Sequence, residues 1–450
     1  MDAQPLQDVA ERLLAAAKRH GASAADVVVA EGDTLEVGVR LGEVEKVKQA
    51  RQKHLGLRVF IDKRSAITSS ADFSHLALEQ LAEDTCSLAR VIAPDPFSGL
   101  PQAEELAAQI PDLDLYDPAI DALTAEQAIA AARETEQAAL DSDPRITNSE
   151  GASYSSHTGR VVYASTLGFS GEYRTSSVSL SVVPVAAANG AMQRDYWYSA
   201  QRKLARLEEP AAVGRQAAAR VLRRLNARRM PTCEVPVIFD AETAASLLSH
   251  LAGAVSGYAL YKRTSFLLDK LGQRLAPEWV TVVDDGTIPG GLGSKPFDAE
   301  GLATRRTVVV DRGMLASYLL DTYSARKLNS RSTGNAARSV GDAPHVAPTN
   351  LVLQPGTASP ADIISSVKRG LYVTELIGFG INPVTGDYSR GAVGQWIEDG
   401  AFAYPVEEIT IAGNLLGMYD RIEAIGNDLQ LRHAVAAPTV KIACMTVAGN

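Results

Sequence analysis

The chain has 450 residues, and its 44 lysines and arginines against 53 aspartates and glutamates give a formal net charge of −9. A surface that neutralises phosphates needs an excess of positive charge, so this balance argues against a general nucleic-acid-binding protein. With 46% hydrophobic and 22% charged residues, the composition is that of a globular protein and not of a disordered or fibrous one. At roughly 100–200 residues per domain, the length predicts two to four domains.

The three cysteines, Cys86, Cys233 and Cys444, lie far apart and form no CxxC pair. Such a set is typical of a reducing compartment and argues against a disulfide framework or a cysteine-rich zinc site. The first twenty residues lack the basic start and apolar run of a secretory signal. The longest weakly polar stretch, 181–192, is too short and too broken to cross a bilayer. We therefore expect a soluble cytoplasmic protein that does not contact membranes.

The first part of the chain has the pattern helix, antiparallel strands, helix. Apolar residues over 6–17 recur at helical spacing. Alternating apolar residues over 35–41 and 55–61 predict strands joined by tight turns. A second helix is expected over 74–92, which completes an N-terminal α/β unit of residues 1–93.

The same order recurs after a proline-rich segment. Residues 94–120 hold five prolines among carboxylates and predict a linker or a connection draped over the surface. A helix begins near Thr124, whose spacing to Gln127 fits a capping box. Strands are expected over 159–164, 169–175 and 177–185, and an arginine-rich helix over 210–227. Residues 121–230 therefore form a second α/β unit that duplicates the architecture of the first.

From residue 231 to 450 the pattern changes to short β-like segments separated by glycines. Strands are expected over 235–239, 279–284, 306–311, 351–354, 401–405 and 440–447. One helix begins at the cap Asp240, and another covers 359–369 and ends at Gly370. The predicted fold class is α+β, with duplicated N-terminal helix/β-meander/helix units followed by a mixed, β-rich C-terminal domain.

The helix after Asp240 is where a metallopeptidase site would be sought, because it carries His250 among small residues. A helical zinc site needs two imidazoles about one turn apart and a glutamate between them. The residues one turn from His250 are Ser246 and Ala254, which do not bind zinc, and the other six histidines form no spaced pair. The pattern favours an exposed or interface histidine over a metal ligand.

Ser324 and Lys327 match the S-x-x-K pattern of acyl-enzyme hydrolases, in which the lysine can deprotonate the serine. No K-T-G or S-D-N motif accompanies the pair, and a pattern this short often arises by chance. A hydrolase with an unrecognised site therefore stays a minor alternative.

A run of arginines stands out in this acidic chain. It consists of Arg215, Arg220, Arg223, Arg224, Arg228 and Arg229. Arginines near a helix C-terminus interact favourably with the helix dipole and usually form a solvated face. No aromatic residues for base stacking accompany them, so contact with DNA is the weaker interpretation.

A glycine-rich stretch over 376–394 carries few charges. Together with a second turn-rich segment near residue 333, it predicts backbone turns that line a cleft and hydrogen-bond an extended peptide. The candidate substrate-binding residues are Ser332, Thr333, Gly334, Asn335, Asp387, Tyr388, Ser389 and Arg390. The alternative is that the glycines only serve tight turns between strands, and both interpretations stay open.

Several long motifs, all in the same order, resemble the TldD/PmbA metallopeptidase family and are closer to its PmbA (TldE) branch. They are FLLDKLG at 266–272, KPFDAEG at 295–301, YSARKL at 323–328, STG at 332–334, GDYSRG at 386–391, EITIAGN at 408–414 and IGND at 425–428. The resemblance covers nearly the whole chain. It implies a two-subunit metalloprotease that processes or degrades unfolded peptides in the bacterial cytoplasm.

In the TldD branch of the family a helix carries H-E-x-x-x-H and binds zinc with help from a later cysteine. The resemblance lays this motif on Ser249, His250 and Ala254, so both ligands and the glutamate are replaced. Near Ala437, where the cysteine is expected, there is none. The resemblance thus implies a silent subunit with no catalytic residues, metal or cofactor of its own, which completes the substrate channel of a zinc-carrying, TldD-like partner in a heterodimer.

Two further interpretations stay open beside this one. The chain could self-associate as a homodimer when it is alone. It could also be a non-proteolytic binding protein of the gyrase-modulator type that acts through the arginine run.

Overall fold

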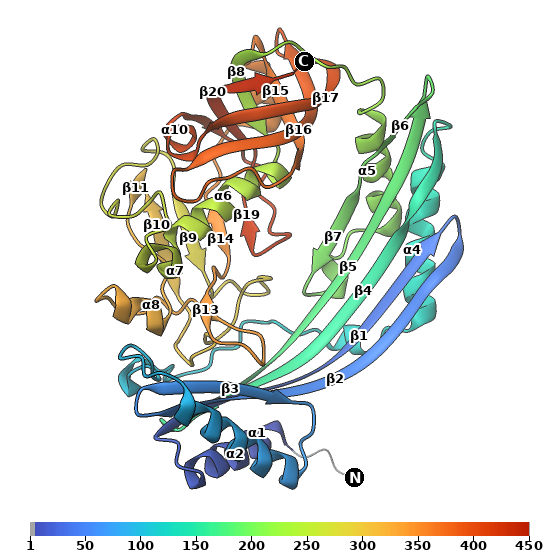
Figure 1. Ribbon diagram of the computed structural model, residues 1–450. Helices are drawn as coiled ribbons and strands as arrows, with labels where there is room; N and C mark the ends of the chain where they lie inside the picture. The colour runs from blue at the N-terminus through green and yellow to red at the C-terminus, as the bar shows by residue number, and fades with distance from the viewer. Residues whose placement is uncertain (1–4, 450) are drawn as a thin grey trace.

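The computed structural model describes residues 5–449, and its N-terminal half is built on one long, curved antiparallel sheet (Figure 1). The strands are β1 (Ala24–Arg40), β2 (Glu43–Ile61), β3 (Arg64–Ser70), β4 (Ile146–Ser165), β5 (Ser170–Ala188), β6 (Ala191–Arg194) and β7 (Trp197–Gln201). Their order is β3-β2-β1-β4-β5-β6, and β7 also pairs with β5. The β1–β4 pairing therefore joins the two predicted N-terminal units in a single sheet.

Two pairs of helices cover one face of this sheet. They are α1 (Leu6–Arg19) with α2 (His75–Val91), and α4 (Ala125–Leu140) with α5 (Pro210–Leu222). Val27 and Val29 of β1 pack with the first pair, and Leu35 and Val37 pack with the second. Alternate residues of a strand share a face, so all four side chains point the same way. The α+β class and the repeated helix/β-meander/helix pattern are confirmed, whereas the domain boundaries stay a prediction.

Two sequence predictions in this half differ from the structure. The strand predicted over 159–164 is the end of the 20-residue β4, and those predicted over 169–175 and 177–185 belong to the single 19-residue β5. The polar serine and threonine positions of these long strands gave no apolar signal. The arginine-rich helix ends at Leu222 and not near residue 227. The chain turns there through Asn226, which has a positive φ of 63°, a conformation that asparagine tolerates.

The segment between the two helix pairs follows the surface of the C-terminal domain. It contains η1 (Ala103–Glu105) and α3 (Pro118–Asp121). Leu106 forms a β-bridge with Leu302, and Arg326 donates to the carbonyl oxygen of Gly99. Leu100, Leu113 and Leu115 are buried along the way.

Two sheets form the C-terminal domain, and the largest hydrophobic core of the molecule lies between them. The first has the order β11-β10-β9-β14-β19, with β9 (Val282–Asp285), β10 (Arg306–Asp311), β11 (Met314–Leu315), β14 (Leu351–Leu353) and β19 (Val435–Ala436). The second has the order β17-β16-β15-β8-β20-β18, with β8 (Cys233–Phe239), β15 (Arg369–Ile377), β16 (Asp387–Glu398), β17 (Ala401–Asn414), β18 (Ile422–Ile425) and β20 (Val440–Ala448).

Short elements and one long helix complete this domain. They are α6 (Ala241–Val255), α7 (Gly257–Tyr261), α8 (Thr322–Lys327), α9 (Pro360–Ser365), α10 (Leu415–Asp420) and the small ribbon of β12 (Ala336–Ala337) and β13 (His345–Val346). The helix predicted over 359–369 is only the six-residue α9. Gly370 does not end a helix but lies in β15, where a Cβ would come within 2.8 Å of the carbonyl oxygen of Pro236.

A cluster of buried ion pairs connects the N-terminal sheet with the C-terminal domain. Asp26 lies on the face opposite the helices and accepts hydrogen bonds from Arg58 and, at 2.8 Å, from Arg338. Its side chain is fully buried. Glu300 of the C-terminal domain lies 3.6 Å from Arg58. Within residues 5–449 no helix combines the length and the apolar character that crossing a membrane requires.

Candidate functional site

Helix α6 carries all three positions of the degenerate metal motif. The helix begins where the Asp240 side chain accepts the N–H of Thr243 at 2.8 Å, and its apolar face packs into the core. Ser249 is exposed, and its hydroxyl donates to the carbonyl oxygen of Ala245 one turn earlier. Ala254 is buried and offers only a methyl group. Between them, these positions present one helix-bonded hydroxyl, one imidazole and no carboxylate.

His250 is the only one of the three positions that could ligate a metal, and its surroundings keep it neutral. Its ring lies edge-on to Tyr388, with 6.0 Å between the ring centroids. Burial, and after it the positive charge of Arg390, lower the pKa of His250 to about 4. At neutral pH the ring is therefore uncharged, and its Nε2 is buried without a hydrogen-bond partner.

These residues do not fit a catalytic zinc ion. Zinc in peptidases is held by three protein ligands, and α6 offers one imidazole where two and a glutamate are needed. The guanidinium of Arg390, which acts electrostatically on His250, would also repel a divalent cation there. In the described part of the chain no three histidine, cysteine or carboxylate side chains are grouped so that they could hold a metal.

Two of the predicted substrate-binding residues do meet His250. Tyr388 and Arg390 alternate along β16 and point to the same side as the histidine. The Tyr388 hydroxyl and the Arg390 Nε are buried without hydrogen-bond partners, as is the His250 Nε2. Their neighbours Asp387 and Ser389 are exposed, and Asp387 accepts the hydroxyl of Thr385 at 2.6 Å. The structure thus assembles a cationic polar cluster of His250, Tyr388 and Arg390.

The residues from Ser332 to Asn335 lie in a different, internally bonded turn. The Ser332 hydroxyl donates to the carbonyl oxygen of Leu320, and the Asn335 amide donates to Asp284 at 2.6 Å. Gly334 has a φ of +75°, and a Cβ there would lie 2.7 Å from the carbonyl oxygen of Ala303. No hydrogen bond within residues 5–449 joins this turn to residues 387–390. Their contact with substrate stays a prediction.

Ser324 and Lys327 do not form the pair that a serine hydrolase would need. The Ser324 hydroxyl is buried and donates to the cap carboxylate of Asp321 at 2.5 Å. The Lys327 Nζ lies 4.1 Å from the ring centroid of Phe97 instead. In this arrangement the lysine cannot take the proton of the serine, so the geometry gives the hydrolase alternative no support.

Our sequence analysis missed a pocket at the start of α6, which we call the α6 pocket. It has a volume of about 180 Å³, and its walls come from both halves of the molecule. The residues that line it include Trp197, Arg223, Asp240, Glu242, Asp428 and Arg432. In Figure 1 it corresponds to the region where β7 and α5 approach α6 and β19.

The arginine run is a solvated face only in part: Arg215, Arg228 and Arg229 are exposed, as the sequence suggested, whereas the middle of the run turns inward to this pocket. Arg220 and Arg224 are buried. Arg220 donates to Asp195 at 3.2 Å, and Arg224 donates to Glu375 at 2.6 Å. Arg220 and Arg224 are four residues apart, which places them on the same side of the chain. The sequence did not indicate that this side is buried, because their acidic partners, Asp195 and Glu375, are distant in the sequence.

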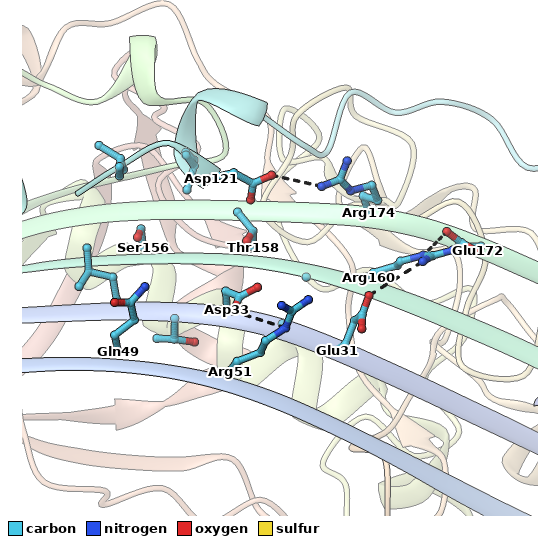
Figure 2. Close-up of a pocket in the computed structure, with 16 residues that line it drawn as sticks. Glu31, Asp33, Gln49, Arg51, Asp121, Ser156, Thr158, Arg160, Glu172 and Arg174 are labelled. Carbon is cyan, nitrogen blue, oxygen red and sulfur yellow. Dashed lines mark hydrogen bonds and ion pairs between the residues drawn. The ribbon is translucent and has the colours of Figure 1, made fainter. Parts of the chain in front are cut away.

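A larger cavity of about 530 Å³ lies on the sheet between the two helix pairs (Figure 2). Seven charged side chains from the sheet and α3 line it, and each of them has a partner of opposite charge. The pairs are Arg51 with Asp33, Arg160 with Glu31 and Glu172, and Arg174 with Asp121. No residue of α6 lines this cavity, and its charged side chains are paired with one another, so we do not take it as the candidate site.

Comparisons with known proteins agree with this geometry. Models of the PmbA/TldA metallopeptidase family match domain 1 at residues 25–89, the central domain at 118–225 and the C-terminal domain at 232–449. The chain is 40% identical to the metalloprotease PmbA of Escherichia coli O157:H7, over 97% of this chain and 94% of that one.

Two solved structures have the same fold. The first is a putative modulator of DNA gyrase from Bacteroides thetaiotaomicron, which is 27% identical with a TM-score of 0.93 over the full length of both chains. The second is TldE from Thermococcus kodakarensis, which is 21% identical with a TM-score of 0.88 over 98% of this chain and 99% of that one. The second likeness concerns the fold alone.

Proposed function

Because the chain belongs to the PmbA/TldA metallopeptidase family, we propose that it is the non-catalytic, TldE-type subunit of a cytoplasmic peptidase with two kinds of subunit. A TldD-like partner supplies the zinc and activates the water. The observation that carries this proposal is the combination on α6 of Ser249, a neutral His250 and Ala254 with the cation of Arg390 beside them.

The task of this chain is to complete the channel that receives an unfolded peptide. The α6 pocket supports this role because it opens between the two halves of the molecule and lies one helical turn before Ser249. The cluster of His250 on α6 with Tyr388 and Arg390 on β16 adds buried polar groups without partners, and such groups favour binding over metal chemistry.

A role as a DNA or gyrase binder through the arginine run is less well supported. Arg220 and Arg224 are buried and paired with acids of the same chain, so they do not present a cationic face to a partner. The gyrase description belongs to a structural relative and refers to that protein.

The proposal is tested with the purified chain, an unfolded polypeptide and a purified TldD homologue. The chain alone should leave the polypeptide intact and should contain almost no zinc by elemental analysis after dialysis. The mixture should cleave it, and a chelator should stop the cleavage. The TldD homologue alone is the control for the contribution of this chain. Robust zinc-dependent cleavage by the isolated chain would contradict the proposal.

A further inference from the structure

The carboxylates that line the α6 pocket are already engaged by the protein. The pairs are Asp240 with the N–H and hydroxyl of Thr243, Glu242 with the hydroxyl of Tyr198, and Asp428 with the N–H and hydroxyl of Thr439. Arg432 in the same pocket lies 2.9 Å from Glu208 and 3.5 Å from Glu242. Asp240 also lies 3.7 Å from Arg220, so Asp240, Glu242 and Arg432 have partners of opposite charge, and Asp428 is held by hydrogen bonds from Thr439.

Arg223 is different, because no ion pair or side-chain hydrogen bond holds its guanidinium in the described part of the chain. In the described part of the chain no carboxylate oxygen lies within 4.0 Å of its guanidinium, and its Nε and Nη2 are buried without hydrogen-bond partners. Burial lowers the pKa of Arg223 and the positive charge of Arg220, on the preceding turn of α5, lowers it further, and the more distant carboxylates of Asp195 and Asp240 offset only part of this effect. Arg223 is partly buried, and leaving two of its charged N–H groups out of water without an acceptor is costly, so this end of the pocket favours an anion.

The start of α6 strengthens this preference. Ala241 and Glu242, the first two residues of the fifteen-residue helix, line the pocket. The N-terminus of a helix carries partial positive charge that attracts anions, and the cap carboxylate of Asp240, which accepts the N–H of Thr243, already uses part of it. Ala245 also lines the pocket and is bonded to Ser249 one turn later. A turn of helix rises by about 5–6 Å, which is the length of about two residues of extended peptide.

We propose that the α6 pocket binds a carboxylate of the substrate peptide, and that Arg223 and the start of α6 hold it. The ligand is the C-terminal carboxylate or an acidic side chain near the peptide end, and the bound group fixes the peptide about two residues from Ser249. The inference rests on the proposed function, since it names how a peptide in the channel would be anchored.

Equilibrium binding to the full chain tests this anchor without any catalysis. Three N-terminally labelled hexapeptides of alanine and leucine are compared by fluorescence anisotropy: a free acid, its C-terminal amide, and the amide with a glutamate as its last residue. The free acid should bind at least tenfold more tightly than the neutral amide, as expected for a charge-assisted hydrogen bond. The glutamate peptide shows whether a side-chain carboxylate is accepted equally well.

Variants then assign the effect to one side chain. Arg223→Gln should remove the preference for the free acid, and Arg223→Lys should keep part of it. Arg215→Gln is the matched control, since it removes an exposed arginine of the same helix and should leave the preference unchanged. Should the Arg223 variants fail to fold, the acid and amide peptides still decide the question on the unaltered chain.

The outcomes separate the two proposals. Equal binding of acid and amide, or a preference that survives Arg223→Gln, overturns the carboxylate anchor and leaves the silent-subunit role standing. Absence of any peptide binding, with the chain alone and with its partner, overturns both the anchor and the channel role. Cleavage by the isolated chain contradicts the silent-subunit role without bearing on the acid preference.

Discussion

At the scale of single residues, the neutral His250 makes stability fall as the pH drops. Its folded pKa of about 4 lies below the ordinary value of 6.5, so the unfolded chain binds more protons between these two pH values. The free energy of unfolding therefore decreases as the pH falls from about 6.5 to about 4, with a share from this half-buried ring of at most about 2 kcal/mol after solvent screening. His250→Gln should flatten the loss between pH 7 and pH 5 in urea unfolding.

The control for this prediction is Arg390→Gln, which removes the smaller of the two causes of the shift. The pKa of His250 should then rise but stay below 6.5, because burial remains. An NMR titration of the ring measures it, and an unchanged pKa would show that Arg390 does not act on the ring. His157 also has a lowered pKa, through burial and Arg202, so each variant is compared with the parent chain.

The same residues show how far the sequence could describe the site. The sequence alone shows that no second histidine lies one turn from His250 on its helix, because Ser246 and Ala254 are close to it along the chain. The contact of His250 with Tyr388 and Arg390 could not be predicted from the sequence, because it joins a helix to a strand that follows much later in the chain. The burial of Arg220 was missed for the same reason, since its partner Asp195 lies outside the helix.

At the scale of elements, the cap of α8 explains why Ser324 is buried in the structure. Asp321 accepts the N–H of Ser324, and the Ser324 hydroxyl lies near the N–H of Asp321 in return, which completes a capping box. Asp321→Ala should lower the free energy of unfolding by about 1–2 kcal/mol, and Ser324→Ala by about 1 kcal/mol. Urea unfolding measures both.

Activity measurements on the same two variants separate a cap from a nucleophile. In the presence of a TldD homologue, Ser324→Ala should keep peptide cleavage at the level of the parent chain under conditions where both are folded. A selective loss of cleavage with unchanged stability would instead revive the hydrolase interpretation. The buried position of Ser324, with 1% of its surface exposed, favours the first result.

Helix starts could be predicted from the sequence because capping is local. Thr124 and Asp240, which the sequence indicated as helix starts, each accept the backbone N–H three residues later, and Ser74 at the start of the helix expected over 74–92 does the same. Strand lengths could not be predicted in this way. The first half of β4 is mostly polar, and its pairing with β1 and β5 holds it in the sheet. Pairing between distant strands decided those limits.

At the scale of the whole molecule, the two halves meet at Asp26, which is buried and bonded from both sides. Burial raises the pKa of Asp26, but Arg338 and Arg58 outweigh it and hold the pKa below the ordinary 3.8. The carboxylate therefore contributes stability above pH 4, and this contribution is lost as the pH falls through the folded pKa. Arg58 belongs to the sheet and Arg338 to the C-terminal domain, so the cluster couples them.

Removing one charged partner from this cluster should lower the free energy of unfolding of the whole molecule. Arg338→Met leaves the Asp26 charge with only Arg58 in a buried site, and breaking a buried pair typically costs about 3–5 kcal/mol. The matched control is Arg194→Met, which breaks an exposed pair with Glu150 and should cost less than about 1 kcal/mol. Urea unfolding at pH 7 measures both, and equal effects would show that Asp26 does not couple the halves. The α6 pocket draws its walls from both halves, so Arg338→Met should also weaken peptide binding there, whereas Arg194→Met should not.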